Sequence, residues 1–152
     1  MKRQCGASKF EFAVTVVILV VLAAVLLVRL TAIEAEAERT EVNLTVRNIR
    51  VGIQLAIGER IMRGEEDRIG EVAQASPVDF AVAYSGDRPH SFSAGRFPEA
   101  PGQWAYDPAS RELAYRPRLP EAFDGVEELR WRYVARFDAS GKAVGAALVR
   151  LN

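Results

Sequence analysis

The stretch that decides the fold is residues 12–28, FAVTVVILVVLAAVLLV, which runs for 17 positions without a charge, a glycine or a proline. A helix in a soluble protein rarely stays apolar on every side for this length, because one face has to meet water. A bilayer-spanning helix needs about 20 apolar residues. Phe10 and Leu30 extend the stretch to that length if the charged residues Glu11 and Arg29 are tolerated at its rims. We therefore predict one transmembrane helix within residues 7–30.

The charges on either side of this helix predict its orientation, because positively charged flanks stay on the cytoplasmic side of a membrane. The residues before the helix are basic and those after it are acidic: Lys2, Arg3 and Lys9 precede it, and Glu34, Glu36, Glu38 and Glu41 follow it. The N-terminus is therefore predicted to be cytoplasmic. A secretory signal peptide fits less well, because the apolar stretch is long and residues 31–33 continue into further helical sequence.

A glycine and a glutamate mark the cytoplasmic end of the apolar stretch. Gly6 follows a short basic leader, and Glu11 lies five residues later, in the segment GASKFEF. A carboxylate at the edge of a hydrocarbon core is costly and is a functional candidate by default. The basic leader, the glycine, the glutamate and the unbroken apolar helix together resemble the N-terminal segment of the type IV pilin and pseudopilin family.

The resemblance implies that a prepilin peptidase removes the leader, residues 1–6, by cutting between Gly6 and Ala7, and that Ala7 is then N-methylated. It also implies that Glu11 pairs with the free amine of Ala7 in an adjacent subunit of a helical filament. Removing either charge would leave the other buried without a partner, at a cost of several kcal/mol. The family usually has Phe or Met at the position of Ala7, and an aliphatic residue or Thr at that of Lys9.

Residues 31–64 predict an amphipathic continuation of the helix, with Gly64 at the expected C-cap. Apolar residues recur at spacings of three and four, which places them on one broad face. The stripe consists of Val42, Val46, Ile49, Ile53, Ile57 and Ile61, widened by Leu44, Val51, Leu55 and Met62. A coiled-coil stalk is the alternative, but Gly52 and Gly58 interrupt its heptad. We therefore favour packing of the stripe on a sheet.

Residues 65–101 predict a short helix, at positions 65–74, and then a connecting loop with many turn signals. In residues 102–152 the apolar periodicity changes to two, which is typical of β-strands. A hairpin is predicted around residues 107–110, followed by a strand at 130–137 and a last strand at 144–151. The sequence thus predicts an α+β fold, in which a long N-terminal helix packs on an antiparallel sheet of about four strands.

The side chains of the strand at 130–137 alternate almost strictly. Trp131, Tyr133 and Phe137 are predicted to face the helix, and the arginines between them to face outward. These three residues, Arg130, Arg132 and Arg136, are interpreted as a solvated strand face rather than a contact for DNA phosphates. The formal net charge of zero supports this interpretation, because nucleic-acid-binding domains carry a basic excess.

Other chemistry finds little support in the residues. One cysteine excludes an internal disulfide, and one histidine, His90, argues against a zinc site with nitrogen and sulfur ligands. The acids Glu65, Glu66 and Asp67 lack the spacing of an EF-hand, and residues 138–142 lack the acid density of a calcium loop. Neither a nucleophile with its base nor a phosphate-binding loop is found. We therefore predict no enzyme activity, no metal and no cofactor.

The resemblance and the residues together predict a structural subunit, a minor pilin or pseudopilin, of a type IV pilus or a type II secretion-like filament. The expected partners are prepilin peptidase, other pilin or pseudopilin subunits, an inner-membrane assembly platform and membrane lipid. The chain is expected to cross the inner membrane once, with its C-terminal domain in the periplasm, before entering a pilus or pseudopilus. The alternative is an unprocessed bitopic inner-membrane protein with a periplasmic binding domain.

Overall fold

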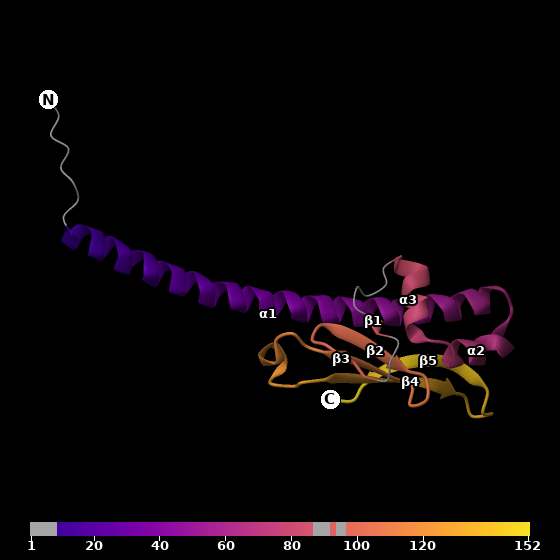
Figure 1. Cartoon of the computed structure of the whole chain (residues 1–152). Coiled ribbons are helices and arrows are strands. Elements are labelled where there is room, and N and C mark those ends of the chain that lie inside the picture. Colours follow the sequence, from indigo (N-terminus) through magenta and orange to yellow (C-terminus); the bar gives the residue numbers. More distant parts are fainter. Residues whose placement is uncertain (1–8, 87–91, 94–96) are drawn as a thin grey trace. The chain divides into compact units, whose positions relative to one another are not determined.

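The computed structural model describes residues 9–86, 92–93 and 97–152 (Figure 1). The chain divides into two compact units, the first ending at Ala37 and the second being Glu38–Asn152. One helix, α1 (Lys9–Met62), runs through both. In the second unit α1 lies along one face of a β-sheet (Figure 1), so the predicted α+β arrangement is confirmed.

One face of α1 forms half of the core in the second unit. Val42, Val46, Ile49 and Ile53 are at most 6% exposed and belong to the same buried cluster as the aromatic residues of the sheet. Their spacing of three and four residues puts them on one side of the helix, as predicted. Packing of this stripe on a sheet, rather than in a coiled-coil stalk, is therefore confirmed.

The predicted widening of the stripe is wrong. Leu44, Val51, Leu55 and Met62 are between 47% and 83% exposed, and Ile61 is 50% exposed. A helix turns by about 100° per residue, so residues nine positions apart, such as Leu44 and Ile53, point in opposite directions. A single sheet covers only one side of the helix; Leu44, Val51, Leu55 and Met62 lie on the other, and Ile61 lies at the margin, about 80° from Ile53.

The end of α1 depends on Gly64, as the sequence predicted. Gly64 adopts a left-handed conformation with φ of 69°. Its N–H donates to the carbonyl of Ile61 at 3.0 Å, and the N–H of Glu65 donates to the carbonyl of Arg60 at 2.9 Å. This pair of hydrogen bonds is the Schellman motif, which satisfies carbonyls that the helix leaves without partners.

The segment after α1 contains more helix than the sequence predicted. The expected short helix forms as the 3₁₀ turn η1 (Glu66–Arg68) and α2 (Ile69–Gln74). The expected loop contains a further helix, α3 (Pro77–Ser85). Proline at the first position is favourable because its ring already has a helical φ, and Gly86, with φ of 74°, ends the helix. Two of the turn signals in this segment, Pro77 and Gly86, thus mark the ends of a helix.

Among the described residues the sheet has five strands in the order β1-β2-β3-β4-β5, one more than predicted. The strands β2 (Gln103–Asp107), β3 (Glu112–Arg116), β4 (Leu129–Phe137) and β5 (Ala143–Arg150) are antiparallel neighbours. The fifth, β1 (Phe92–Ser93), pairs in parallel with β2, so the sheet is mixed. A two-residue strand has too short a pattern to be recognised by periodicity. The second 3₁₀ turn, η2 (Pro120–Phe123), joins β3 to β4.

Aromatic side chains fill the space between the sheet and α1. The ring centroids of Trp104 and Tyr115 are 4.6 Å apart, and those of Trp104 and Trp131 are 5.5 Å apart. Trp131 and Tyr133 face the core as predicted, but Phe137 is 64% exposed. The register of β4 with β5 shifts between Arg136 and Phe137. Such an irregularity breaks the strict alternation of faces, and the prediction for Phe137 was wrong for this reason.

Candidate functional site

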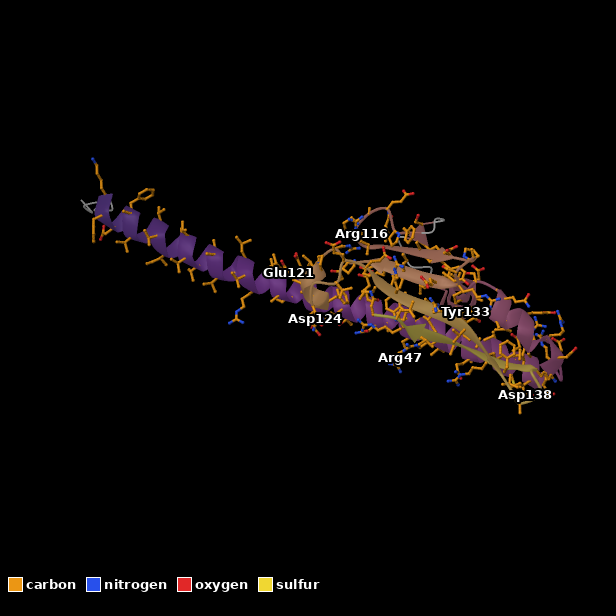
Figure 2. All side chains as sticks on the ribbon, turned by 90° about the horizontal axis from the view of Figure 1, so that it is seen from below. Arg47, Arg116, Glu121, Asp124, Tyr133 and Asp138 are labelled. Atoms are coloured by element: carbon orange, nitrogen blue, oxygen red, sulfur yellow. The ribbon has the colours of Figure 1, made fainter. Side chains whose placement is uncertain are left out.

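The N-terminal part of α1 carries side chains on all sides of the helix (Figure 2). Its large apolar residues, from Phe10 to Ile33, are between 40% and 77% exposed. The helix is long and apolar enough to cross a membrane. An apolar surface of this extent on a soluble protein marks a membrane or protein contact. This segment is therefore the first part of the candidate site.

Glu11 lies in the first turn of α1, and its side chain is exposed. An acid in this position interacts favourably with the partial positive charge of the helix N-terminus. Its carbonyl oxygen accepts a hydrogen bond of 2.8 Å from the hydroxyl of Thr15, so this polar side chain of the apolar stretch bonds within the helix. Gly6 and Ala7 lie outside the described residues, so their cleavage, the methylation of Ala7 and its pairing with Glu11 stay predictions.

A second apolar surface follows the same helix into the second unit. Leu44, Val51, Leu55 and Met62 are separated by seven, four and seven residues, which aligns them along one side of α1. We name these four residues the outer stripe. They lie opposite the buried residues that contact the sheet. The helix of the second unit is thus apolar on two sides, of which the described parts of the chain cover only one.

The carboxylate of Glu38 attaches α1 to the sheet and is only 5% exposed. Its Oε1 accepts hydrogen bonds from the hydroxyl of Tyr115 at 2.8 Å and from the N–H of Arg118 at 2.6 Å. Its Oε2 accepts one from the N–H of Leu119 at 3.0 Å. Three donors offset the cost of burying the charge. Burial and the contact with Glu38 raise the pKa of the Tyr115 hydroxyl.

Further hydrogen bonds fix α1 and α2 on the sheet. Arg39 donates to the carbonyl of Ala122 in η2, and Nη2 of Arg50 donates to the carbonyl of Leu148 in β5 at 3.2 Å. The hydroxyl of Tyr133, a residue labelled in Figure 2, donates to the carbonyl of Val72 in α2 at 2.8 Å. These contacts determine which side of α1 faces away from the sheet, and hence the direction of the outer stripe.

Arg130 and Arg132 of β4 face away from the core, as predicted, whereas Arg136 is exposed but lines a groove that Ile53 of α1 also lines. Arg132 and Arg130 both reach Glu112, at 2.6 Å and 3.8 Å, and Arg130 also pairs with Glu128 at 2.6 Å. Acids of the neighbouring strand and loop therefore neutralise two of the three cations. Arg136 is exposed and forms no ion pair with any residue that the structure describes.

The two acidic segments considered for calcium make other contacts. Glu65 pairs with Arg60 at 2.7 Å and with Arg68 at 3.4 Å. Oδ1 of Asp138 accepts hydrogen bonds from the hydroxyl and the N–H of Ser140 and from the N–H of Lys142, which lower the pKa of Asp138. Within the described ranges, no group of three potential metal ligands is found. His90 lies outside those ranges.

The sequence interpretation missed the role of Glu38, which it counted only among the acids that set the membrane orientation. A signal was present, because Glu38, Val42 and Val46 are spaced by four residues and so lie on one face. Extending the buried stripe by one step toward the N-terminus would have included Glu38. Its three donors, however, come from residues 77 to 81 positions away.

Comparisons with known proteins found no match to the chain. The chain matches no protein-family model, no curated protein and no solved structure.

Proposed function

We propose that the chain is a structural subunit of a helical envelope filament, a minor pilin or pseudopilin of a type IV pilus or type II secretion-like system. The observation that carries this proposal is the pair of uncovered apolar surfaces on α1. The first surrounds residues 10–33, and the second is the outer stripe. Both belong to one helix, so one kind of partner can cover both.

Membrane lipid alone covers only the first of these surfaces. A bilayer core accommodates about 20 helical residues, and Met62 lies 32 residues beyond Leu30. The outer stripe therefore stays in water as long as the subunit stands alone in the membrane. In a filament, helices of neighbouring copies pack against one another and cover both surfaces. Such an array is an open assembly, in which each copy contacts the next by the same operation.

The N-terminal residues supply the entry into this assembly. Cleavage between Gly6 and Ala7 creates a free amine on the cytoplasmic side, and Glu11 offers the carboxylate that pairs with it in a neighbouring copy. Before assembly, the chain crosses the inner membrane with its second unit in the periplasm. Its partners are prepilin peptidase, the assembly platform and other subunits. No step of this role needs a catalytic residue of the chain.

The mass of the full-length protein tests the maturation step. We expect co-expression with prepilin peptidase to shorten the chain to a start at Ala7, with one added methyl group. Without the peptidase, Met1 should remain. The variant Gly6→Val is the matched control, and it should stay uncut in both strains while still inserting into the membrane, because the apolar helix is unchanged.

The alternative function predicts that the mass does not change when the peptidase is present. A bitopic protein with a periplasmic binding domain keeps its leader in the presence of the peptidase. An intact N-terminus in that strain would therefore overturn the filament proposal.

A further inference from the structure

The outer stripe is bordered by opposite charges on its two sides. Glu41 stands three residues before Leu44 and Arg47 three residues after it. At about 100° per residue these positions lie about 60° to either side of the stripe. Both side chains are exposed, and neither forms an ion pair among residues 9–86, 92–93 and 97–152. The stripe thus separates a free acid from a free base.

The basic side of the stripe faces the β5 edge of the sheet. Arg50 lies on this side of α1, since it donates to the carbonyl of Leu148 in β5. Next to it is a groove of about 150 Å³ between α1 and the sheet, lined in part by Arg50, Gln54 and Arg136. We define the basic flank as Arg47, Arg50 and Arg136. Arg50 and Arg136 line the same groove, so an acid from another molecule would be favourable there.

The acidic side of the stripe faces α3. Glu59, Phe80 and Ala83 line one depression between α1 and the helices that follow it. Glu59 lies 18 residues after Glu41, which is five helical turns, so the two acids share one side of α1. We define the acidic flank as Glu41 and Glu59. Glu59 pairs with Arg63 at 2.5 Å, whereas Glu41 is available to a partner.

We propose that the outer stripe packs against the same helix of a second copy, with Arg47 of one copy against Glu41 of the next. This inference rests on the proposed function and specifies the contact between its subunits. The apolar residues in the centre of the contact supply the buried area, and the charges at its sides select the register and orientation of the two helices. Each copy carries both charges, so the pair joins a base of one copy to an acid of the next.

The positions of the two charges also determine how neighbours are displaced. Arg47 and Glu41 are six residues apart along α1, which is about 9 Å at 1.5 Å per residue. Two copies must therefore slide by about 9 Å along the helix axis to bring the guanidinium level with the carboxylate. A displacement along the axis excludes a closed two-fold dimer, because the second Arg47–Glu41 pair is then pulled apart. The contact joins unlike positions on the two copies, as successive subunits of an open filament do.

Charge reversal in the full-length chain tests this pairing. Two forms of the chain with different C-terminal tags are co-expressed, and the recovery of one with the other is measured from detergent-solubilised membranes. When both tagged forms carry Arg47→Glu, or both carry Glu41→Arg, we expect recovery to fall roughly fivefold, since a weak attraction becomes a repulsion. The double variant, with both reversals, should regain most of the wild-type recovery.

The matched control is Arg116→Glu, which makes the same charge change on β3. Arg116 is exposed and lies well away from Arg47 (Figure 2), so its variant should associate like the wild type. Wild-type recovery together with unchanged recovery of Arg47→Glu would overturn the pairing and leave the filament proposal standing. A double variant no better than the single variants would overturn it as well. Absence of wild-type association would instead count against the filament proposal itself.

Discussion

At the scale of single residues, Glu38 shows how one buried charge can determine the docking of a helix. Its two oxygens accept from a tyrosine hydroxyl and from two backbone N–H groups of the segment after β3. The backbone N–H groups of Arg118 and Leu119 donate to the carboxylate, and so take the place of the water that would solvate it in the unfolded chain. A buried acid with three donors favours one position of the helix over positions displaced by a turn.

Replacing Glu38 by glutamine should destabilise the second unit without changing its fold. The amide nitrogen of glutamine would face an N–H donor, so at least one hydrogen bond to a charged acceptor is lost, at about 2 kcal/mol. Urea unfolding of the full-length chain in detergent can be followed by the fluorescence of Trp104 and Trp131, which are buried in the core. The exposed control Glu127→Gln should change the free energy of unfolding by less than about 0.5 kcal/mol. Equal stability of the two variants would contradict the role of Glu38.

Glu11 makes a different prediction, because its expected partner belongs to another molecule. Glu11→Ala should impair incorporation into the filament but not insertion into the membrane, because the apolar stretch is unaffected. The free amine of Ala7 would then be buried without its counter-charge. The measurement is the share of the membrane-inserted protein that enters filaments when the variant is co-expressed with wild type. Glu34→Ala, at the other rim of the stretch, is the control, and equal incorporation of both variants would exclude the pairing.

At the scale of elements, the end of α1 depends on a glycine that the backbone conformation requires. Gly64→Ala should lower the free energy of unfolding by about 1 kcal/mol, because an L side chain is strained at φ of 69°. Gly58 provides the control, since it lies within α1 and a Cβ there would meet no atom within 4 Å. Gly58→Ala should stabilise the helix by up to about 1 kcal/mol. Thermal unfolding measures the change in stability of both variants. A shift of the same sign in both would contradict the role of Gly64.

The outer stripe is also an element-scale feature, and its role can be separated from folding. Val51 and Val149 are equally exposed, at 47%, but Val51 lies in the outer stripe and Val149 in β5. Val51→Asp should reduce association between copies several-fold, because a charge would be buried in the contact. Val149→Asp should leave association unchanged. Cross-linking in membranes measures both, and circular dichroism verifies that each variant keeps its fold. Equal cross-linking of the two would rule out the outer stripe as a contact.

At the scale of the whole molecule, two buried tyrosines connect the helices to the sheet and make its stability sensitive to alkali. Burial raises the pKa of the Tyr115 and Tyr133 hydroxyls, and both donate hydrogen bonds that their phenolates could not donate. In the unfolded chain these groups titrate near pH 10. Their folded pKa is the higher one, so the stabilisation is complete below about pH 10 and is lost as the pH rises toward the folded pKa.

We therefore expect the thermal midpoint of the full-length chain to fall above about pH 10. The ultraviolet absorbance of tyrosinate from the buried residues should appear together with unfolding and not before it. The thermal midpoint of Tyr133→Phe should fall less steeply as the pH rises. At neutral pH it should be lower than that of the wild type, because the variant lacks the hydrogen bond to Val72. Ionisation of Tyr115 and Tyr133 in a chain whose core remains folded would contradict the prediction.

The sequence by itself determined the features that depend on local periodicity. Seventeen residues without a charge specify a helix that suits a membrane, apolar spacings of three and four specify its continuation, and alternation from Trp104 onward specifies strands. Gly64 could be placed at the helix end because its conformation is a local property. The expected roles of Gly6, Ala7 and Glu11 rest instead on the resemblance of their segment to the pilin N-terminus, and they stay predictions.

Only the tertiary structure decided which side of α1 is covered. Val42 and Leu44 are equally apolar in the sequence, but one is 2% and the other 55% exposed, because the single sheet reaches one side of the helix. The burial of Glu38 likewise depends on donors about 80 residues away. The exposure of Phe137 depends on a register shift between two strands. Periodicity records which residues share a face, whereas coverage of that face is decided by chain segments that are distant in sequence.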